Sequence, residues 1–387
     1  MSLGEVFAVD TTSVQLTWSR LPRGRYRAEA SDGSTSRSVD MEGADGPAAL
    51  TLDGWEPGSE VTIRIVGSGG SHRVHRIATL APPGPELVRI ATLSDLHLGS
   101  VSFGRPVALR EPGVSVHHPL RCARRALADL VDWGAAHLFI KGDLVDSSTP
   151  LAWEQAATLI EESPIPVTIV CGNHEKNRLS TVDAFSEAAR HGIELCRDVT
   201  AVDLDGLRVV LIDSARPHSD VGRWAPLLDA TQRAVDVATP ALVLSHHQPQ
   251  RTPIPTYYPP GVPSPIARTF VRAVREANPA VFGSSGHTHR HRRHRIDGMP
   301  WTETGSPKDY PGTWTGYTVH AHGIVQSVHR VSGDDCLPWL ERSGAAALGT
   351  WRRWSPGRLA DRCFGHTWPI SELPRATAPA ALAQGDR

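Results

Sequence analysis

Apolar and polar residues alternate in short runs through the first part of the chain, residues 1–83. The segments SVQLTWS, GRYRAEAS and EVTIRIVG each have an apolar residue at every second position, and Gly, Pro, Asp and Ser lie between the segments. Successive side chains of a strand point to opposite faces, so a period of two predicts strands with one buried face. We expect residues 1–83 to form an all-β sandwich domain.

The pattern changes after APPGPE at 81–86, which we interpret as a proline-rich linker. From LVRIATLSD at 87–95 onward, short apolar strands alternate with amphipathic stretches of helical period. The further strands are HLFI, PVTIV, LRVVLID and ALVLS, and the predicted helices are 120–133, 151–161, 181–191 and 265–277. This alternation is typical of an α/β fold, in which ligand sites lie beyond the carboxyl ends of the strands.

Strands are predicted again from residue 292. RHRID and PWTETGS flank a turn at Gly298, and YTVHAHGIVQSVHR forms a hairpin about Gly323. The α/β domain is therefore expected to span 87–330. Residues 331–387 lack clear periodicity and end in a low-complexity Ala/Pro tail, so we expect a C-terminal extension that is partly disordered.

Composition narrows the classes of function. The chain has 387 residues, with 40 basic and 41 acidic side chains, so it has no overall field to attract nucleic acid or an anionic membrane. Five scattered cysteines have no C-x-x-C spacing and indicate reduced thiols. The sequence has neither a signal-peptide pattern nor an apolar run long enough to span a membrane, which predicts a cytoplasmic protein without membrane association.

Chemistry is concentrated in five polar clusters, each at the predicted end of a strand. They are SDLHLG at 94–99, KGDLVD at 141–146, CGNHEK at 171–176, SHHQP at 245–249 and GHTHRH at 286–291. Carboxylate and amide oxygens combined with imidazole nitrogens suit Mn, Fe, Zn or Ni ions. Residues i and i+2 of a strand share a face, so Asp95 and His97 are expected to point the same way, as are His287 and His289.

The order D-x-H, G-D, G-N-H-E, H, G-H-x-H from residue 94 to residue 291 resembles the calcineurin-like metallophosphoesterase superfamily. The motifs look most like the branch that contains cyclic-nucleotide phosphodiesterases. The resemblance implies a two-sheet α/β sandwich that holds two divalent metal ions. By this resemblance, one ion is held by Asp95, His97 and His289, the other by Asn173, His246 and His287, and Asp143 bridges both.

The same resemblance implies the reaction. A hydroxide held between the two cations attacks the phosphorus of a phosphodiester or phosphomonoester, and His174 protonates the leaving group as general acid. Asp146 orients that histidine and raises its pKa. We expect the substrate to be a small-molecule phosphoester, a class to which nucleotides belong. Between the two activities we favour that of a phosphodiesterase.

Two departures and two alternatives qualify this interpretation. Where purple acid phosphatases have an iron-binding tyrosine this chain has Asp146, and it lacks the D-R-G arginine of protein phosphatases. A nuclease would use the same metals, although the charge balance disfavours it. A non-catalytic, metal-bound interaction scaffold is the third reading, but such a protein is expected to have lost some of the seven ligands.

In the first domain, LTLDGWEPGSEVTIRIVG, preceded by Trp18, resembles a fibronectin type III domain, whose partner the sequence does not name. Outside the ligand pattern, His247 is expected to pack in the core or to support a ligand rather than bind metal, because a continuing strand would point it away from the metals. The basic segment 290–295 fits either a cationic rim for phosphate or a solvated hairpin. His117 and His118 lie in the long loop after His97 and are expected to form a surface pair rather than to reach the pocket.

Two longer segments also have alternative roles. The insert at 248–265 contains Tyr257 and Tyr258, which fit stacking on a planar leaving group, or it is a plain proline-rich covering loop. The segment 352–369 mixes Trp and Arg and is expected to pack on the catalytic domain rather than act as a lid.

Overall fold

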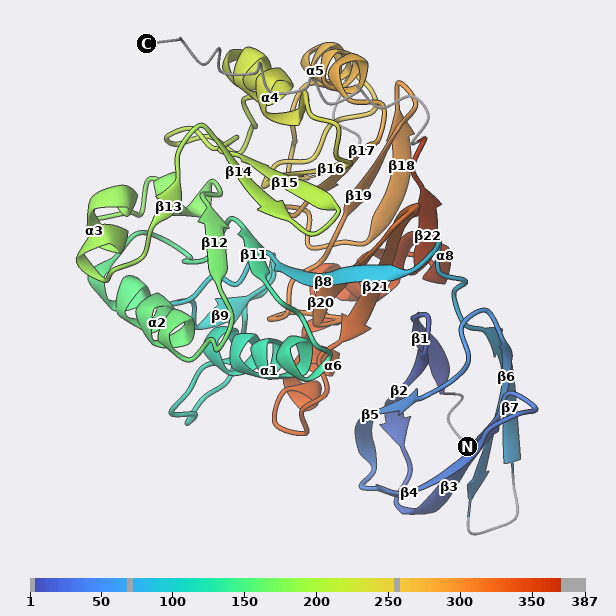
Figure 1. Cartoon of the computed structure of the whole chain (residues 1–387). Helices are drawn as coiled ribbons and strands as arrows, with labels where there is room; N and C mark the ends of the chain where they lie inside the picture. Colours follow the sequence, from blue (N-terminus) through green and yellow to red (C-terminus); the bar gives the residue numbers. More distant parts are fainter. Residues whose placement is uncertain (1–3, 68–71, 254–257, 370–387) are drawn as a thin grey trace, which may run out of the picture.

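The computed structural model describes residues 4–67, 72–253 and 258–369 (Figure 1). The first part of the chain is all-β, as predicted, and consists of two small antiparallel sheets. One contains β1 (Glu5–Val9), β2 (Ser13–Leu21) and β5 (Gly46–Asp53) in that order. The other contains β4 (Ser36–Gly43), β3 (Gly24–Ser31), β6 (Glu60–Gly67) and β7 (His72–Ala78).

The core of this domain consists of the alternating apolar residues that the sequence indicated. Leu16 and Trp18 of β2 pack with Val61, Ile63 and Ile65 of β6, and each of these side chains is buried. Burial of one face of each strand is the driving force that closes the two sheets on each other. The fibronectin type III assignment and the boundary at residue 83 remain predictions.

The second part contains a seven-stranded mixed sheet. Across the sheet its strands are β13 (Leu195–Cys196), β12 (Val167–Val170), β11 (Leu138–Lys141), β8 (Glu86–Leu93), β20 (Thr313–His320), β21 (Gly323–Arg330) and β22 (Phe364–Thr367). β8, β11, β12 and β13 are parallel, whereas β20, β21 and β22 pair antiparallel with their neighbours. The mixed order arises because the last three strands return as a hairpin and an added edge strand.

A six-stranded sheet forms the second layer. Across the sheet its strands are β14 (Val199–Leu204), β15 (Leu207–Ile212), β16 (Ala241–Ser245), β17 (Val281–Ser285), β19 (Met299–Glu303) and β18 (Arg292–Ile296). Phe139 of β11 and Tyr317 of β20 share one buried cluster with Leu242 of β16 and Phe282 of β17. The two sheets therefore pack face to face, which confirms the predicted two-sheet α/β sandwich.

Helices cover the outer faces of both sheets (Figure 1). The seven-stranded sheet carries α1 (His118–Asp132), α2 (Pro150–Glu161) and α3 (Ala184–Arg190), and the six-stranded sheet carries α4 (Leu228–Val235) and α5 (Ser264–Ala277). In α5, Ala267, Phe270, Val271 and Val274 are buried at the three- and four-residue spacing of one helix face. The predicted helices are thus present, with ends that differ by a few residues.

Short elements complete the described chain. They are β9 (Ser102–Phe103), β10 (Leu109–Arg110), the 3-10 helices η1 (His174–Lys176), η2 (Ala225–Leu227) and η3 (Ala347–Gly349), and the helices α6 (Leu337–Ser343), α7 (Thr350–Trp354) and α8 (Leu359–Arg362). The segment 352–369 packs on the α/β domain, since β22 pairs with β21. The predicted Ala/Pro tail lies outside the described residues.

The all-β domain contacts the α/β domain through polar groups and through an apolar cluster that joins β1 to Cys363. The Gln15 side chain accepts a hydrogen bond from the Arg330 backbone N–H (2.7 Å) and donates one to the Arg330 carbonyl oxygen (3.0 Å). Trp133 Nε1 donates to Asp10 Oδ2 (2.8 Å). Within the described residues, none of the helices combines the length and apolarity that crossing a membrane requires.

Candidate metal centre

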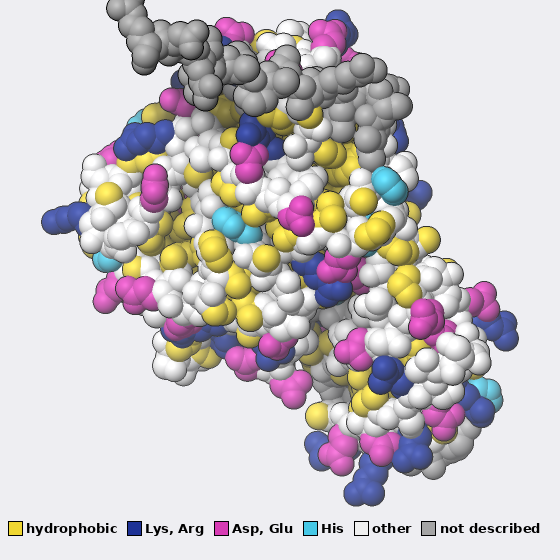
Figure 2. Space-filling model, in the orientation of Figure 1, with side chains coloured by type: hydrophobic (Ala, Val, Ile, Leu, Met, Phe, Trp, Pro, Cys, Tyr) yellow, Lys and Arg dark blue, Asp and Glu magenta, His cyan; other side chains and the backbone are white. Residues whose placement is uncertain are grey.

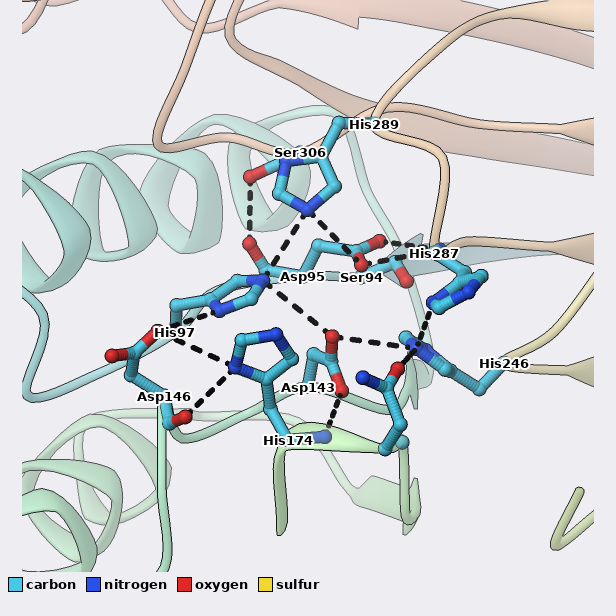
Figure 3. Close-up of polar contacts among 12 residues, drawn as sticks. Ser94, Asp95, His97, Asp143, Asp146, His174, His246, His287, His289 and Ser306 are labelled. Atoms are coloured by element: carbon cyan, nitrogen blue, oxygen red, sulfur yellow. Dashed lines mark hydrogen bonds and ion pairs between the residues drawn. The ribbon is translucent and has the colours of Figure 1, made fainter. Parts of the chain in front are cut away.

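All five predicted clusters meet at the carboxyl ends of the parallel strands (Figure 3). Asp95 follows β8, Asp143 follows β11 and Asn173 follows β12, all in the seven-stranded sheet. His246 follows β16 and His287 follows β17 in the other sheet. The two sheets therefore contribute opposite sides of one site, as expected for an α/β fold.

The prediction that the period of a strand directs Asp95 and His97 to one face is wrong. β8 ends at Leu93, so neither residue belongs to a strand, and both have left-handed backbones with φ of 59° and 50°. His287 (φ 67°) and His289 (φ 50°) repeat this geometry after β17. Left-handed backbone costs a non-glycine residue about 1–3 kcal/mol and persists where the surroundings impose it. The tight loops, and not the period of a strand, turn these side chains inward.

The first predicted ligand group is compact. His97 Nε2 lies 3.3 Å from His289 Nε2, and His289 Nε2 lies 3.4 Å from Asp95 Oδ1. Asp95 is fully buried, and both its carboxylate oxygens accept hydrogen bonds from the His287 backbone N–H. Burial opposes ionisation of Asp95, but His289 and His246 outweigh this effect and lower the pKa of Asp95, so its carboxylate stays ionised.

The second group lies beside the first. His246 Nε2 lies 3.0 Å from Asn173 Oδ1 and 3.1 Å from His287 Nδ1. Asp143 Oδ2 lies 3.3 Å from His246 Nε2 and 3.5 Å from His97 Nε2, so a single oxygen stands between the two groups. This is the arrangement that the predicted bridging role requires.

The donor set fits two divalent cations. Donors at right angles around an ion, with bonds of about 2.1 Å, lie about 3 Å apart, and the spacings here are 3.0–3.5 Å. Two imidazole nitrogens that face each other can share at most one proton unless a cation lies between them. Groups of His and Asp that could hold a metal ion are found here and include Asp95, His97 and His289. The chemistry of the donors therefore favours mixed oxygen and nitrogen coordination.

Contacts behind the ligands select which imidazole nitrogen faces the site. His97 Nδ1 donates to Asp146 Oδ1 (3.0 Å), His289 Nδ1 to Asp309 Oδ2 (2.6 Å) and His246 Nδ1 to the Lys141 carbonyl oxygen (2.8 Å). Each bond fixes the ring so that Nε2 is directed at the predicted metal position. We did not predict Asp309, although a carboxylate shortly after the predicted strand PWTETGS was a visible signal.

Two further carboxylates were also missed. Asp220 Oδ1 accepts a hydrogen bond from Asn173 Nδ2 (3.2 Å), which turns the amide oxygen of Asn173 toward His246. Glu175 accepts from the backbone N–H groups of Asp143 (3.1 Å), Val145 (2.9 Å) and Gly172 (2.6 Å). Glu175 therefore joins the two ligand loops, and its place in the G-N-H-E motif was the signal available.

His174 and Asp146 form the exposed side of the site. Their side chains are 33% and 39% exposed, whereas those of Asp143 and His97 are 2% and 6% exposed. His174 Nδ1 donates to the Asp146 carbonyl oxygen (2.8 Å) and lies 3.4 Å from Asp146 Oδ1 (Figure 3). Burial opposes the imidazolium, but Asp143 and Asp146 together raise the pKa of His174 to about 10. Asp146 contacts His97 as well, which the sequence did not indicate.

Other predictions for single residues had mixed outcomes. His247 is buried, with Nδ1 2.8 Å from Ser214 Oγ, as expected for a core residue. The surface prediction for His118 is wrong, since it is buried and stacks on Trp339 with ring centroids 3.8 Å apart. Neither reading of 290–295 holds for His291, which is buried and hydrogen-bonded to Thr313. Hydroxyl or aromatic side chains from distant segments contact these three rings.

The proline-rich insert reaches the surroundings of the site. Tyr258 is 69% exposed, and its hydroxyl donates to Asp220 Oδ2 (3.3 Å), the carboxylate that orients Asn173. Tyr257 lies outside the described residues. Figure 2 shows one face of the molecule, on which a histidine lies among acidic and apolar side chains near the middle of the α/β domain.

The comparisons with known proteins agree with this geometry. The family described as calcineurin-like phosphoesterase matches residues 88–291, just over half of the chain. A probable cyclic nucleotide phosphodiesterase of Synechococcus is 26% identical over 165 residues, which cover 41% of this chain and 58% of that relative. The match therefore spans less than two thirds of the length of the relative.

Similarities to solved structures are weak. PhoD has a TM-score of 0.43 at 10% identity and covers 83% of this chain and 85% of its own. A putative 5'-nucleotidase from Staphylococcus aureus has a TM-score of 0.41 at 12% identity, with 64% and 55% covered. Neither similarity supports a statement about function. The family match covers more than half of the sequence, and the chain therefore belongs to the calcineurin-like phosphoesterase family.

Proposed function

We propose that the chain is a dinuclear metal-dependent phosphodiesterase of small molecules. The observation that carries the proposal is the position of Asp143 Oδ2, 3.5 Å from His97 Nε2 and 3.3 Å from His246 Nε2. A carboxylate oxygen between two sets of nitrogen and oxygen donors is the arrangement by which two cations share a ligand.

The seven predicted ligands have distinct tasks in this proposal. Asp95, His97 and His289 hold one cation, Asn173, His246 and His287 hold the other, and Asp143 contacts both. When bound, the cations would neutralise the charge of the phosphoryl group and lower the pKa of water, so that a hydroxide is the nucleophile. The protein itself supplies position, because its ligand loops are tied to the ends of two packed sheets.

His174 is the proposed general acid. It is more exposed than the predicted ligands beside it, so a leaving-group oxygen can approach its ring from solvent. Its Nδ1 is occupied by Asp146, which leaves Nε2 to donate the proton. The raised pKa keeps the ring protonated near neutral pH, although bound cations would lower that pKa because like charges repel. Asp146 is the proposed orienting residue.

The substrate class is a phosphodiester, and a cyclic nucleotide is the first to test. The resemblance to a probable cyclic nucleotide phosphodiesterase supports this choice. Mn²⁺, Fe²⁺, Zn²⁺ and Ni²⁺ all suit the mixed donors, so the metal pair is part of the test.

The first experiment compares hydrolysis of bis(p-nitrophenyl) phosphate, p-nitrophenyl phosphate and cyclic AMP with each metal. Asp143→Asn should abolish turnover of all three substrates, and Asp205→Asn, on an exposed turn, is its matched control. His174→Ala should reduce cyclic AMP hydrolysis by about 10²–10⁴-fold. Its effect on the p-nitrophenyl esters should be much smaller, because p-nitrophenolate leaves without protonation.

Three outcomes would reject the proposal. Hydrolysis of the monoester alone would indicate a phosphomonoesterase. Cleavage of plasmid DNA without turnover of the small diesters would favour the nuclease. No cleavage of any of these substrates with any of the four metals would favour the non-catalytic scaffold.

A further inference from the structure

A helix of the C-terminal extension contacts the predicted metal centre. α7 lies outside the residues 88–291 that the family match covers. Trp351 Nε1 donates a hydrogen bond to Asp309 Oδ1 (3.2 Å), and Asp309 Oδ2 accepts from His289 Nδ1 (2.6 Å). The two oxygens of one buried carboxylate therefore connect an indole of the extension to a predicted metal ligand.

The residue after α7 secures both ends of this connection. The Ser355 carbonyl oxygen accepts from the His291 backbone N–H (2.9 Å), two residues beyond His289. The Ser355 hydroxyl donates to the Tyr310 carbonyl oxygen (2.7 Å), one residue beyond Asp309. Ser355 therefore holds both the loop that carries His289 and the loop that carries Asp309.

Aromatic packing restricts the same groups. Phe103 packs beside both the extension and the predicted ligand, with its ring centroid 5.8 Å from that of Trp351 and 6.3 Å from that of His289. The Trp351 and His289 rings are themselves 6.3 Å apart. Lys308 Nζ lies 4.6 Å from the Phe103 centroid and 3.4 Å from Asp309 Oδ2, which adds a positive charge beside the carboxylate.

The helix is anchored to the catalytic domain on its other side. Arg352, the next residue after Trp351, forms an ion pair with Glu341 of α6. Glu341 also pairs with Arg330 of β21 (2.6 Å), and both Glu341 and Arg330 are buried. A paired, buried network of this kind fixes the position of α7, so the Trp351 indole is presented to Asp309 in one orientation.

We infer that Trp351 is a positioning residue that acts through Asp309 to orient His289, so that the C-terminal extension sets the affinity for one of the two cations. The inference rests on the proposed function, because it concerns the ion assigned to Asp95, His97 and His289. A carboxylate with both oxygens bonded holds its imidazole in one orientation, and loss of such an outer contact weakens metal binding. His246, in the other group, is oriented instead by the Lys141 carbonyl oxygen.

The test is equilibrium dialysis of full-length, chelator-treated protein against buffered Mn²⁺, with bound metal measured by atomic absorption. Wild type should bind two ions. Trp351→Phe keeps a ring against Phe103 but removes the indole N–H, and should weaken one site roughly 3- to 10-fold and leave the other unchanged. Asp309→Asn alters the carboxylate that bonds to both Trp351 and His289, and should weaken that site roughly 10- to 100-fold.

Trp354→Phe is the matched control, because this residue lies on the same helix, is 47% exposed, and Phe keeps an aromatic ring beside Arg290. It should retain both wild-type affinities, and melting of the metal-free variants checks that each is folded. If wild type binds two ions and the Mn²⁺ affinities of Trp351→Phe equal those of Trp354→Phe, the inference about Trp351 fails and the proposed function stands. Equal weakening of both sites would also overturn it, since that result indicates general loosening. If wild type binds fewer than two ions, the proposed function fails together with the inference.

Discussion

Gly172→Ala is the substitution for which the structure predicts the sharpest local effect. Gly172 precedes Asn173 and lies against Asp143, the residue between the two ligand groups. A methyl group at Gly172 would stand 2.1 Å from Asp143 Oδ1 and 2.5 Å from the Asp143 backbone nitrogen. The backbone angle φ of Gly172 is not positive, so the strain would come from the contact with Asp143 and not from the backbone conformation.

The size of the displacement follows from contact distances. Ordinary carbon contacts begin at about 3.4 Å, so the Asp143 carboxylate, the Gly172 loop or both must move by about 1 Å. Overpacking of this kind costs about 1–3 kcal/mol of folding free energy. A misplacement of about 1 Å at a reacting centre lowers turnover about 100-fold. We therefore expect weaker binding of both cations, because Asp143 contacts both groups.

The assay measures Mn²⁺ affinity and turnover of bis(p-nitrophenyl) phosphate on the same preparations. Gly46→Ala is the matched control, since a methyl group there has nothing within 4 Å and the φ of Gly46 is not positive. The control should keep wild-type affinity and turnover. The reasoning is refuted if Gly172→Ala binds two Mn²⁺ ions with wild-type affinity.

Three further predictions concern metal, pH and the domain contact. Chelation should abolish activity and lower the melting temperature, since buried Asp95 and Asp143 lose their counter-charge. An ion present at 100 times its dissociation constant stabilises the folded protein by about 2.7 kcal/mol. Added Mn²⁺ should therefore restore both activity and melting temperature. Burial lowers the pKa of His329 to about 4, below the usual 6.5, so its contribution to stability is complete above pH 6.5 and is lost as pH falls toward 4. His329→Phe should reduce the slope of unfolding free energy against pH by about one proton in that window, and an unchanged slope contradicts the assignment. Gln15→Leu leaves the backbone N–H and carbonyl of Arg330 without their bonds, and should destabilise the docked all-β domain by about 2–4 kcal/mol in urea unfolding; a change below about 0.5 kcal/mol would contradict this role.

Much of the fold could be predicted from local patterns. The period of two in GRYRAEAS and EVTIRIVG corresponds to β3 and β6, and the apolar run ALVLS corresponds to β16, in which all five residues are buried. The α/β sandwich, the all-β domain and the family are confirmed. The domain boundaries and the roles of the site residues remain predictions, because proximity of side chains is not evidence of what they bind.

Errors arose where tertiary packing overrides the local pattern. His118 and His291 belong to polar segments of the sequence, yet both are buried, since aromatic or hydroxyl partners from distant segments cover them. Asp95 and His97 were assigned to a strand end because the period fits, but the strand stops at Leu93 and a left-handed loop sets their direction. Burial and loop conformation depend on neighbours that a local pattern does not contain.

The sequence by itself determined the chemistry: which carboxylate, amide and imidazole groups are present, in what order, and that each follows a strand whose carboxyl end lies at one edge of a sheet. That information is local, since residue type and strand period are properties of short segments. Only the tertiary structure decided which partner orients each predicted ligand. Asp309 holds His289, Asp220 holds Asn173 and Trp351 holds Asp309. These contacts join residues with no fixed spacing along the chain, so they exist only after the two sheets and the extension have packed together.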